Sequence, residues 1–366
     1  MMSADIRNYG KDRIGVLFGG RSQEHEISVL SAAALMDAID RDKHEVVPVG
    51  IGKDGRWYIV GGDMSGLRVL SDSRMERLIP RGGSEADIAA CPGARPLSLA
   101  EFADCVDFVF PTLHGPFGED GTVQGLFEMM GIPYAGCGVC ASAVSMDKII
   151  AKELLSRAGI SVLPYTFATE GEYGADTPGV LARIEGVVDY PVYVKPANMG
   201  SSVGVRRAGG RHELAEAIGD ALRYDRRVLV EEESSGRELE AAVLGNDELS
   251  VGAVGEIMTG GGFYDYDTKY RNNVFGLSIP AGIPKDVEAR IKDLTIKTFK
   301  TLDGAGFARV DFFYNEDTGV AYVNEMNTIP GFTQYSMFPQ LWEAAGVDYR
   351  DLIEKIIELG YERHPA

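Results

Sequence analysis

Two apolar, aromatic-rich runs close to the C-terminus constrain the fold of this chain more than any other stretch. Residues 309–313 read Arg-Val-Asp-Phe-Phe, and residues 320–327 read Val-Ala-Tyr-Val-Asn-Glu-Met-Asn. The polar segment between them, residues 315–319, ends in a glycine. Runs of this kind joined by a short polar turn predict an antiparallel hairpin. We therefore expect an antiparallel sheet near the end of the chain.

The polar side chains of this hairpin define its candidate chemistry. Because side chains alternate along a strand, Arg309 and Asp311 share one face, and Glu325 and Asn327 share one face of the partner strand. If those faces coincide, two carboxylates, an amide oxygen and a guanidinium converge. Such oxygen ligands suit Mg²⁺, which fills its remaining positions with water and phosphate oxygens. The alternative is a solvated polar face with a weak surface ion pair, and the hairpin alone leaves both interpretations open.

Composition limits the classes of protein that this chain represents. Its 366 residues are enough for two or three units, each with its own core. A formal net charge of -19 argues against binding nucleic acid over a broad face, because polyanions repel. Residues 1–13 lack a signal-peptide core, and no apolar run approaches the roughly 20 residues of a membrane span. Because a signal-peptide core and a membrane span are not expected, we predict a cytoplasmic protein. Cys137 and Cys140 have no second pair to complete a zinc site.

The first part of the chain has the pattern of a parallel α/β unit. A short apolar run at residues 13–18 ends in two glycines, and residues 27–39 follow with helical spacing. The turn lacks the G-x-G-x-x-G spacing of dinucleotide-binding proteins. Glu24 and Glu26 lie in the expected first helical turn, where acidic residues are routine because they complement the helix dipole. These residues alone do not indicate a site.

A glycine-rich loop follows a further strand expected at residues 106–110. Residues 113–121 read Leu-His-Gly-Pro-Phe-Gly-Glu-Asp-Gly and precede an expected helix at 122–130. Small and rigid residues around a histidine and two acids, at the carboxyl end of a strand, indicate a loop shaped for a ligand. A lone histidine such as His114 is more often structural.

The middle of the chain contains a candidate phosphate-binding segment. Lys195 ends an apolar strand and must find an anion or reach water. Residues 200–204, Gly-Ser-Ser-Val-Gly, form either a simple turn or a loop whose backbone N–H groups and hydroxyls cradle phosphates. A Walker A sequence is absent. The acids at 231–233 would ordinarily be a solvated strand end.

Further elements follow from periodicity and composition. One helix is expected over residues 141–158, an amphipathic helix over 285–302, and closing helices over 338–345 and 349–359. The stretch at 260–270 combines three glycines with several aromatics, which is the composition of a lid over a ligand.

Several of these strings, in this order, resemble the D-alanine:D-alanine ligase family of the ATP-grasp superfamily. They are Gly-Gly-x-Ser-x-Glu-x-Glu, His-Gly-Pro-Phe-Gly-Glu-Asp-Gly, Val-Lys-Pro with Gly-Ser-Ser-Val-Gly, Phe-Tyr-Asp-Tyr-Asp-x-Lys-Tyr, and Glu-x-Asn followed by Pro-Gly. The resemblance implies an α/β fold with an N-terminal parallel-sheet domain, Rossmann-like and of the preATP-grasp type, over residues 1–140. A two-part ATP-grasp domain would follow, with a central subdomain at 141–236 and a C-terminal subdomain at 237–366.

The resemblance also implies an activity. ATP phosphorylates one D-alanine carboxylate, the amine of a second D-alanine attacks the acyl phosphate, and phosphate leaves to give D-alanyl-D-alanine for peptidoglycan synthesis. The implied cofactors are ATP and two Mg²⁺ or Mn²⁺ ions, and the implied assembly is a homodimer without nucleic-acid or membrane partners. The alternatives are a ligase that takes D-lactate or D-serine second, another ATP-grasp carboxylate-amine ligase, and a nucleotide sensor without turnover.

The family's site residues match positions in this chain. The implied catalytic residues are Glu24, Ser201, Tyr270 and Arg309. The implied substrate-binding residues are His114, Gly331, Ser336 and Met337. The implied nucleotide-binding residues are Lys148, Lys195, Ser202, Glu231, Glu232, Ser234, Glu238, Phe263 and Lys269. The implied metal ligands are Asp311, Glu325 and Asn327. Around 231–234 the family reads adenine with backbone groups, and Tyr270 is expected to favour an amine over D-lactate as the nucleophile.

Overall fold

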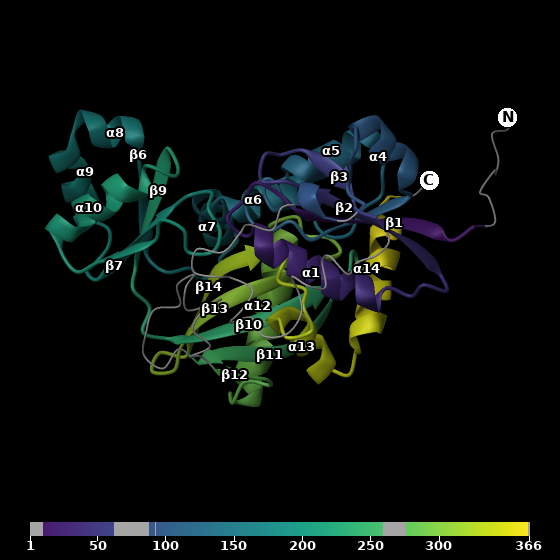
Figure 1. The fold of residues 1–366 in the computed structure, drawn as a ribbon. Helices are drawn as coiled ribbons and strands as arrows, with labels where there is room; N and C mark the ends of the chain where they lie inside the picture. Colours follow the sequence, from purple (N-terminus) through teal and green to yellow (C-terminus); the bar gives the residue numbers. More distant parts are fainter. Residues whose placement is uncertain (1–9, 62–87, 92, 259–275, 365–366) are drawn as a thin grey trace, which may run out of the picture.

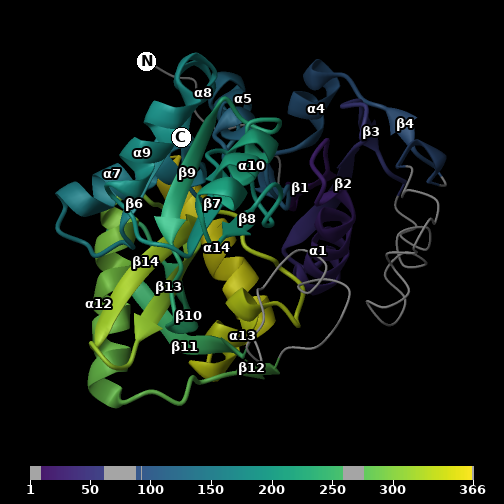
Figure 2. The same cartoon turned by 90° about the vertical axis from the view of Figure 1, so that its left-hand side faces the viewer.

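The computed structural model describes residues 10–61, 88–91, 93–258 and 276–364, and these residues form three β-sheets with helices packed on them (Figure 1). The sheets lie around a common centre, as the rotated view also shows (Figure 2). Of the helices in these ranges, none is long and apolar enough to cross a membrane.

The first sheet has the strand order β4-β3-β2-β1-β5, and its central strands are parallel. Its strands are β1 (Asp12–Gly19), β2 (His44–Ile51), β3 (Trp57–Ile59), β4 (Arg95–Pro96) and β5 (Phe108–Pro111). Its helices are α1 (His25–Ala38), the 3₁₀ helix η1 (Ile88–Ala90), α4 (Leu99–Cys105) and α5 (Thr122–Met130). The parallel α/β unit expected from the first strand, turn and helix is confirmed.

The second sheet is antiparallel, with the order β6-β9-β7-β8. Its strands are β6 (Tyr165–Thr169), β7 (Val192–Pro196), β8 (Arg206–Ala208) and β9 (Arg227–Glu232). Three helices pack on it, namely α8 (Glu170–Ala175), α9 (Thr177–Glu185) and α10 (Arg211–Ala221). The second sheet and these three helices form a separate lobe with its own apolar core, at the upper left of Figure 1, which we call the second lobe.

The third sheet is also antiparallel and has the order β12-β11-β10-β13-β14. Its strands are β10 (Arg237–Leu244), β11 (Ser250–Met258), β12 (Gly276–Ser278), β13 (Phe307–Asn315) and β14 (Val320–Asn327). The remaining helices of this part are α12 (Lys285–Thr301), α13 (Met337–Ala344) and α14 (Tyr349–Arg363). The hairpin predicted from the sequence is confirmed as β13 and β14.

Alternation along β10 assigns the two faces of the third sheet. Ala241 belongs to the core that includes α12, whereas Ala242 belongs to the core that includes α13, α14 and the first sheet. Phe332 lies at the centre of the second of these cores, with its ring centroid 5.4 Å from that of Phe110 and 5.6 Å from that of Phe307. The first and third sheets are therefore held together by one continuous apolar core.

The single helix expected over residues 141–158 is wrong. The structure has two helices there, α6 (Val139–Met146) and α7 (Lys148–Arg157), which are separated at Asp147. Asp147 is extended, and its carboxylate accepts hydrogen bonds from the N–H groups of Ile149 (3.2 Å) and Ile150 (3.1 Å). An N-cap in the middle of a helical pattern ends one helix and starts the next. As a result Lys148 is the first residue of α7 and does not lie inside one long helix.

Candidate active site

The predicted metal face of the hairpin forms as expected. In the register of β13 and β14, Arg309 lies opposite Asn327 and Asp311 lies opposite Glu325. The register then shifts, because Phe312 pairs with the residue two positions before Glu325. This bulge leaves the four polar side chains on one face, the face of the third sheet that α12 does not cover.

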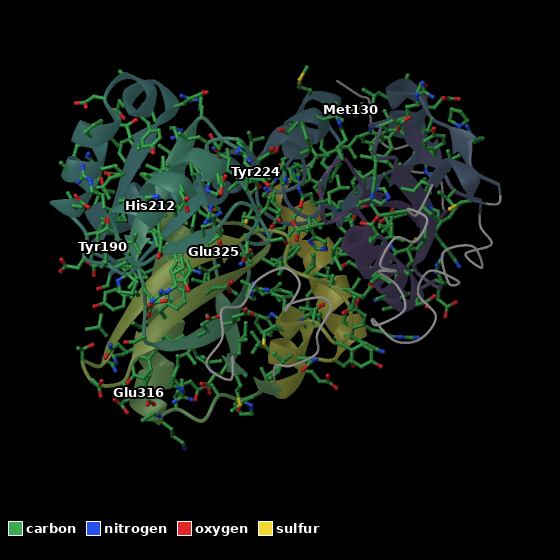
Figure 3. All side chains as sticks on the ribbon, turned by 60° about the vertical axis from the view of Figure 1, so that its left-hand side comes forward. Met130, Tyr190, His212, Tyr224, Glu316 and Glu325 are labelled. Atoms are coloured by element: carbon green, nitrogen blue, oxygen red, sulfur yellow. The ribbon has the colours of Figure 1, made fainter. Side chains whose placement is uncertain are left out.

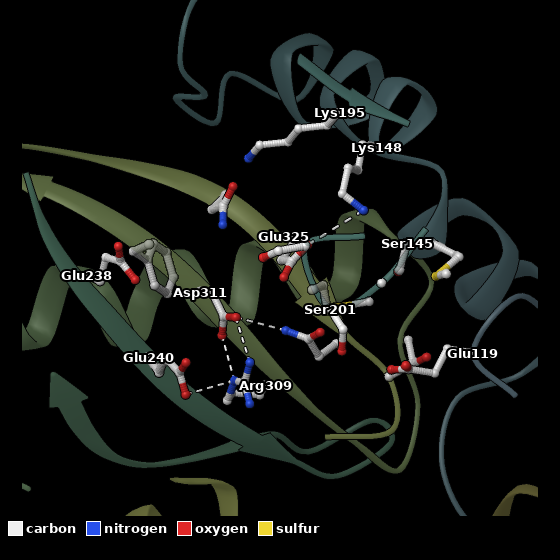
Figure 4. Close-up of a pocket in the computed structure, with 18 of the residues that line it drawn as sticks. Glu119, Ser145, Lys148, Lys195, Ser201, Glu238, Glu240, Arg309, Asp311 and Glu325 are labelled. Carbon is white, nitrogen blue, oxygen red and sulfur yellow. Dashed lines mark hydrogen bonds and ion pairs between the residues drawn. The ribbon is translucent and has the colours of Figure 1, made fainter. Parts of the chain in front are cut away.

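Arg309 is the centre of a buried polar network on this face (Figure 4). Its guanidinium donates to both oxygens of Asp311, at 2.7 Å each, and lies 2.9 Å from a carboxylate oxygen of Glu240. Asn327 donates to Asp311 at 2.9 Å. Although burial opposes the charge, Asp311 and Glu240 hold the pKa of Arg309 well above its ordinary value. The solvated-face interpretation of the hairpin is therefore wrong.

Two lysines face this network, Lys148 from the start of α7 and Lys195 from β7 of the second lobe (Figure 4). Lys148 Nζ donates to the carbonyl of Met199 at 2.6 Å and lies 3.9 Å from Glu325. Burial lowers the pKa of Lys148, and Glu325 partly offsets that effect. Lys195 is also buried, but its ion pair with Glu231 raises its pKa overall. Both ammonium groups therefore stand across the cavity from the carboxylates.

Glu231 is not the solvated strand end that its acidic neighbours suggest. Only 1% of it is exposed, and it forms ion pairs with Lys195 and with Lys152, whose Nζ lies at 2.9 Å. Burial raises the pKa of Glu231, but the two lysines outweigh burial and hold it at about 2. Glu232 accepts a hydrogen bond from the backbone of Asp189 at 3.0 Å. Glu231 and Glu232 thus have distinct, structured roles.

The phosphate-loop candidate meets the first helix of the chain. Ser201 donates a hydrogen bond to the carboxylate of Glu24, which is itself buried. Ser201 and Ser202 adopt left-handed φ angles of 50° and 57°, so the tight turn is made by the serines as well as by Gly204. Glu24 therefore joins the first unit to the loop of the second lobe, which is more than a dipole effect requires.

The loop at 329–332 is held in place by side chains from other elements. His114 Nδ1 lies 2.9 Å from the carbonyl of Ile329, and Glu119 accepts from the N–H of Ile329 at 3.2 Å. Ser31 accepts from the N–H of Phe332 at 3.4 Å, and Tyr349 donates to the carbonyl of that residue. We call these four side chains the loop clamp. His114 thus has a positioning role in addition to any contact with substrate.

Glu119 has a strongly raised pKa. Burial and the neighbouring charge of Glu24 raise its pKa to about 8, although its carboxylate accepts a further hydrogen bond from the N–H of Gly115 at 2.7 Å. Perturbed groups of this kind gather at functional sites. The sequence analysis quoted Glu119 only as part of a string and missed its role.

The residues after the clamped loop are packed closely. A side chain on Gly331 would meet Ser336 Oγ at 2.9 Å, so that hydroxyl would have to move to make room for it. Ser336 Oγ in turn accepts from the N–H of Thr333 at 3.1 Å. Met337 is buried against Gly255 at the start of α13. In the part of the chain that the structure describes, neither Ser336 nor Met337 lines the cavity.

One cavity collects more than half of the predicted site residues that the structure describes, among them Glu325, which is labelled in Figure 3. The predicted residues that line it are Glu24, Lys148, Lys195, Ser201, Ser202, Glu238, Arg309, Asp311, Glu325 and Asn327. The predicted residues that the described lining leaves out are His114, Glu231, Glu232, Ser234, Gly331, Ser336 and Met337. Phe263, Lys269, Tyr270 and the lid candidate lie outside the described residues.

Some residues of the charged network and of the loop clamp were not predicted from the sequence. They are Ser31, Glu119, Lys152, Glu240 and Tyr349. Lys152 had a weak signal, because it lies four residues after Lys148 on the same helix face. Glu240 likewise lies two residues after Glu238 on one strand face. Ser31 and Tyr349 had none, since their role depends on a loop that is far away in sequence.

The donor set suits a hard divalent cation. Asp311, Glu325 and Asn327 offer two carboxylates and an amide oxygen, and Glu325 is 34% exposed toward the cavity. Within the described ranges, no three His, Cys, Asp or Glu residues cluster into a closed metal cage. A partial oxygen set that leaves positions for water and phosphate oxygens is what Mg²⁺ prefers.

Comparisons with known proteins agree with this geometry. The family model for the D-ala D-ala ligase N-terminus matches residues 13–137, and that for the D-ala D-ala ligase C-terminus matches residues 154–358. A D-alanine–D-alanine ligase of Acetivibrio thermocellus is 46% identical, with 97% of each chain covered. One of Geobacillus thermodenitrificans is 44% identical over 97% of this chain and 96% of its own.

Solved structures give the same result. The VanG D-Ala:D-Ser ligase of Enterococcus faecalis superposes with a TM-score of 0.83 at 36% identity, covering 96% of this chain and 100% of its own. The D-alanine-D-alanine ligase of Coxiella burnetii has a TM-score of 0.81 at 33% identity, covering 97% and 95%. From its sequence, its fold and the arrangement of its cavity, this chain belongs to the D-alanine–D-alanine ligase family.

Proposed function

We propose that this chain is an ATP-dependent ligase that joins two D-alanine molecules into D-alanyl-D-alanine, for peptidoglycan precursor synthesis. The observation that carries the proposal is the cavity itself. It holds two cations, Lys148 of α7 and Lys195 of the second lobe, opposite a carboxylate face on the third sheet, with Glu24 of the first unit at its edge. Three separate parts of the chain therefore converge where a nucleotide and two amino acids must meet.

The first D-alanine would bind at the edge of the cavity near Glu24. A buried carboxylate attracts the ammonium group of an amino acid, and His114 would help to hold the substrate carboxylate. The hydrogen bond from Ser201 orients Glu24 for this role. Because Ser201 lies in the candidate phosphate loop, the same contact would couple the substrate to the nucleotide.

Phosphoryl transfer to the first D-alanine carboxylate gives an acyl phosphate and ADP. Lys148 and Lys195 would offset the negative charge that the transferring group carries. The amine of the second D-alanine then attacks the acyl carbon, loses a proton, and phosphate departs. Arg309 and the N–H of Gly331 would stabilise the oxyanion of the tetrahedral intermediate, and Ser336 and Met337 would bind the second substrate.

Asp311, Glu325 and Asn327 would hold Mg²⁺ or Mn²⁺, with two ions in the loaded site. When bound, these ions neutralise phosphate oxygens and orient them. Glu238 would bind the ribose, and the segment from Glu231 to Ser234 the adenine. Glu232 would act there through its backbone, since its side chain is engaged by Asp189.

We also propose the division of the chain into residues 1–140, 141–236 and 237–366, and a homodimeric assembly. Each of the three ranges contributes one sheet, which supports the division. The core shared by the first and third sheets implies that these two parts unfold together.

Product analysis tests the proposed function. The protein is incubated with MgATP and D-alanine, D-serine or D-lactate, separately and mixed, and the products are identified by mass. We expect D-alanyl-D-alanine, ADP and phosphate, with little mixed product near neutral pH. The relatives at 44–46% identity carry the D-alanine–D-alanine name, which supports this expectation.

Other products would identify the alternatives. A product that is mostly D-alanyl-D-serine or D-alanyl-D-lactate would show that the second substrate is D-serine or D-lactate. Phosphate release only with other amino acids would indicate a different carboxylate-amine ligase. Binding of ATP without turnover under all conditions would indicate a nucleotide sensor.

A further inference from the structure

Lys152 is a buried cation that the proposed mechanism does not use. It lies on α7 one turn after Lys148, and only 2% of its surface is exposed. Its Nζ lies 2.9 Å from Glu231 Oε2 and 5.8 Å from the centre of the Tyr165 ring. Lys152 is not among the described residues that line the cavity, so it does not touch a nucleotide there.

Glu231 connects Lys152 to the cavity. Its second carboxylate oxygen, Oε1, forms the ion pair with Lys195, and Lys195 does line the cavity. One buried negative charge is therefore shared between a fully buried cation, Lys152, and a partly exposed one, Lys195. With Lys152 present, the three groups carry one net positive charge, and the group nearest the cavity is Lys195. Without Lys152 the net charge would be zero, and of the two lysines that form ion pairs with Glu231, Lys195 alone would be left to neutralise its buried carboxylate.

Burial makes this difference large. Ion pairs inside a protein are screened much less than those at the surface. When one partner of a buried charged group is removed, the partner that remains must compensate the charge of that group alone. The start of α7 is held independently, because Asp147 pairs with Arg227 of β9. Lys152 is therefore not the only contact that docks this helix on the second sheet.

We propose that Lys152 is a positioning residue for nucleotide phosphates, which takes up part of the charge of Glu231 so that Lys195 presents its positive charge to the cavity. This inference rests on the proposed phosphate role of Lys195. The competing explanation is that Lys152 only docks α7. The two explanations differ in which part of the nucleotide loses affinity.

Binding of ADP and of adenosine, each measured by calorimetry in Mg²⁺ buffer without D-alanine, separates them. In Lys152→Met we expect the Kd for ADP to rise about tenfold while that for adenosine changes by less than about twofold, because only ADP carries phosphates. Lys152→Arg is expected to keep the parental ratio. Equal weakening of both ligands, or no change in either, would overturn the proposal.

A charge-balanced variant decides the question even if Lys152→Met does not fold. Lys152→Met combined with Glu231→Gln removes both charges and leaves Lys195 as the cation of the group. We expect its ratio of ADP to adenosine affinity to stay within about threefold of the parent. A fall of tenfold or more would show that charge balance is not the role of Lys152.

Lys292→Met is the matched control. Lys292 also forms an ion pair at 2.9 Å, with Glu288, but on a partly exposed face of α12. Both affinities should remain at the parental values. If the parent itself bound ADP no more tightly than adenosine, the proposed nucleotide site would fail, which is a result distinct from failure of the role assigned to Lys152.

Discussion

Asp311 and Glu325 face each other across the hairpin, but their side chains are held differently. Asp311 is 13% exposed and is bound by Arg309 and Asn327, whereas Glu325 is 34% exposed. Replacing Asp311 therefore also disturbs a buried guanidinium, whose remaining ion-pair partner among the described residues is Glu240. At the scale of single residues, Glu325 offers the cleaner test of metal binding.

We expect Glu325→Gln to lower kcat in the presence of MgATP by about 10² to 10³, because one charged ligand is lost while the shape of the side chain is kept. The thermal unfolding midpoint should stay near that of the parent. Steady-state kinetics over a range of Mg²⁺ concentrations provide the measurement. Glu316→Gln, on the turn of the same hairpin and paired with Arg237 at 2.7 Å, is the control and should keep full activity. Normal turnover by Glu325→Gln would remove the metal assignment.

Glu119 predicts a pH dependence of folding stability in the ligand-free protein. Its folded pKa is about 8, against an ordinary value of 4.5 for a glutamate, so between these values the native state holds a proton that the unfolded state has lost. Stability should therefore fall as pH rises from about 4.5 to about 8, by on the order of 2 to 4 kcal/mol from this group.

Urea unfolding at several pH values tests this expectation. Glu119→Gln should remove that part of the slope, since an amide does not titrate. Glu128→Gln is the control, because the pKa of Glu128 is lowered and its carboxyl is ionised in both states over this range. A slope that Glu119→Gln leaves unchanged would contradict the raised pKa.

At the scale of elements, the loop clamp links three segments to the loop that carries Gly331. α1 supplies Ser31, the loop after β5 supplies two further side chains, and α14 supplies Tyr349. Both the N–H and the carbonyl of Ile329 and of Phe332 are thereby bound. The loop between them, which carries the N–H of Gly331, is therefore held on both sides. A hydrogen-bond donor must be preorganised in this way to stabilise an oxyanion.

Tyr349→Phe removes one bond of this clamp without removing the ring. We expect a loss of about 1 kcal/mol in the free energy of unfolding and a fall in kcat of about tenfold, with KM for ATP unchanged. Tyr173→Phe is the matched control, because Tyr173 also donates to a backbone carbonyl, that of Ala215 at 2.9 Å, in the second lobe. It should lose similar stability without any loss of kcat. Equal kinetics in the two variants would show that the bond does not position the loop.

At the scale of the whole molecule, the C-terminal helix packs against the first sheet. Gly360 of α14 is buried, and a side chain there would meet Phe108 at 2.5 Å and the carbonyl of Tyr134 at 2.8 Å. Nearby, the Arg363 guanidinium lies 4.3 Å from the centre of the Tyr134 ring. The end of the chain thus joins the first and third sheets, and with them the two sides of the cavity.

Gly360→Ala should destabilise the protein by about 1 to 3 kcal/mol, since the added methyl group overpacks this contact. Gly219→Ala, in the exposed part of α10, should instead stabilise it by about 0.5 to 1 kcal/mol, because nothing lies within 4 Å and alanine favours a helix. Chemical denaturation of both variants is the measurement. A neutral Gly360→Ala variant would show that α14 shifts freely on the first sheet.

Local patterns in the sequence determined the elements and much of the site. Alternation and a turn were sufficient to predict the hairpin and its four polar residues, because strand geometry depends only on neighbouring residues. The strings shared with the ligase family located Lys195, Glu24 and Ser201, which the structure brings to one cavity. Helical periodicity failed at Asp147, since a cap side chain can interrupt a pattern that otherwise continues.

Only the tertiary structure decided which charges are buried and which distant groups meet. The sequence predicts that Glu231 is a solvated strand end. In the structure it is buried between Lys152, from a helix, and Lys195, from another strand. Ser31 and Tyr349 became relevant only because the loop before α13 folds between them. Desolvation and long-range hydrogen bonds depend on how the three sheets pack, and no local pattern encodes that packing.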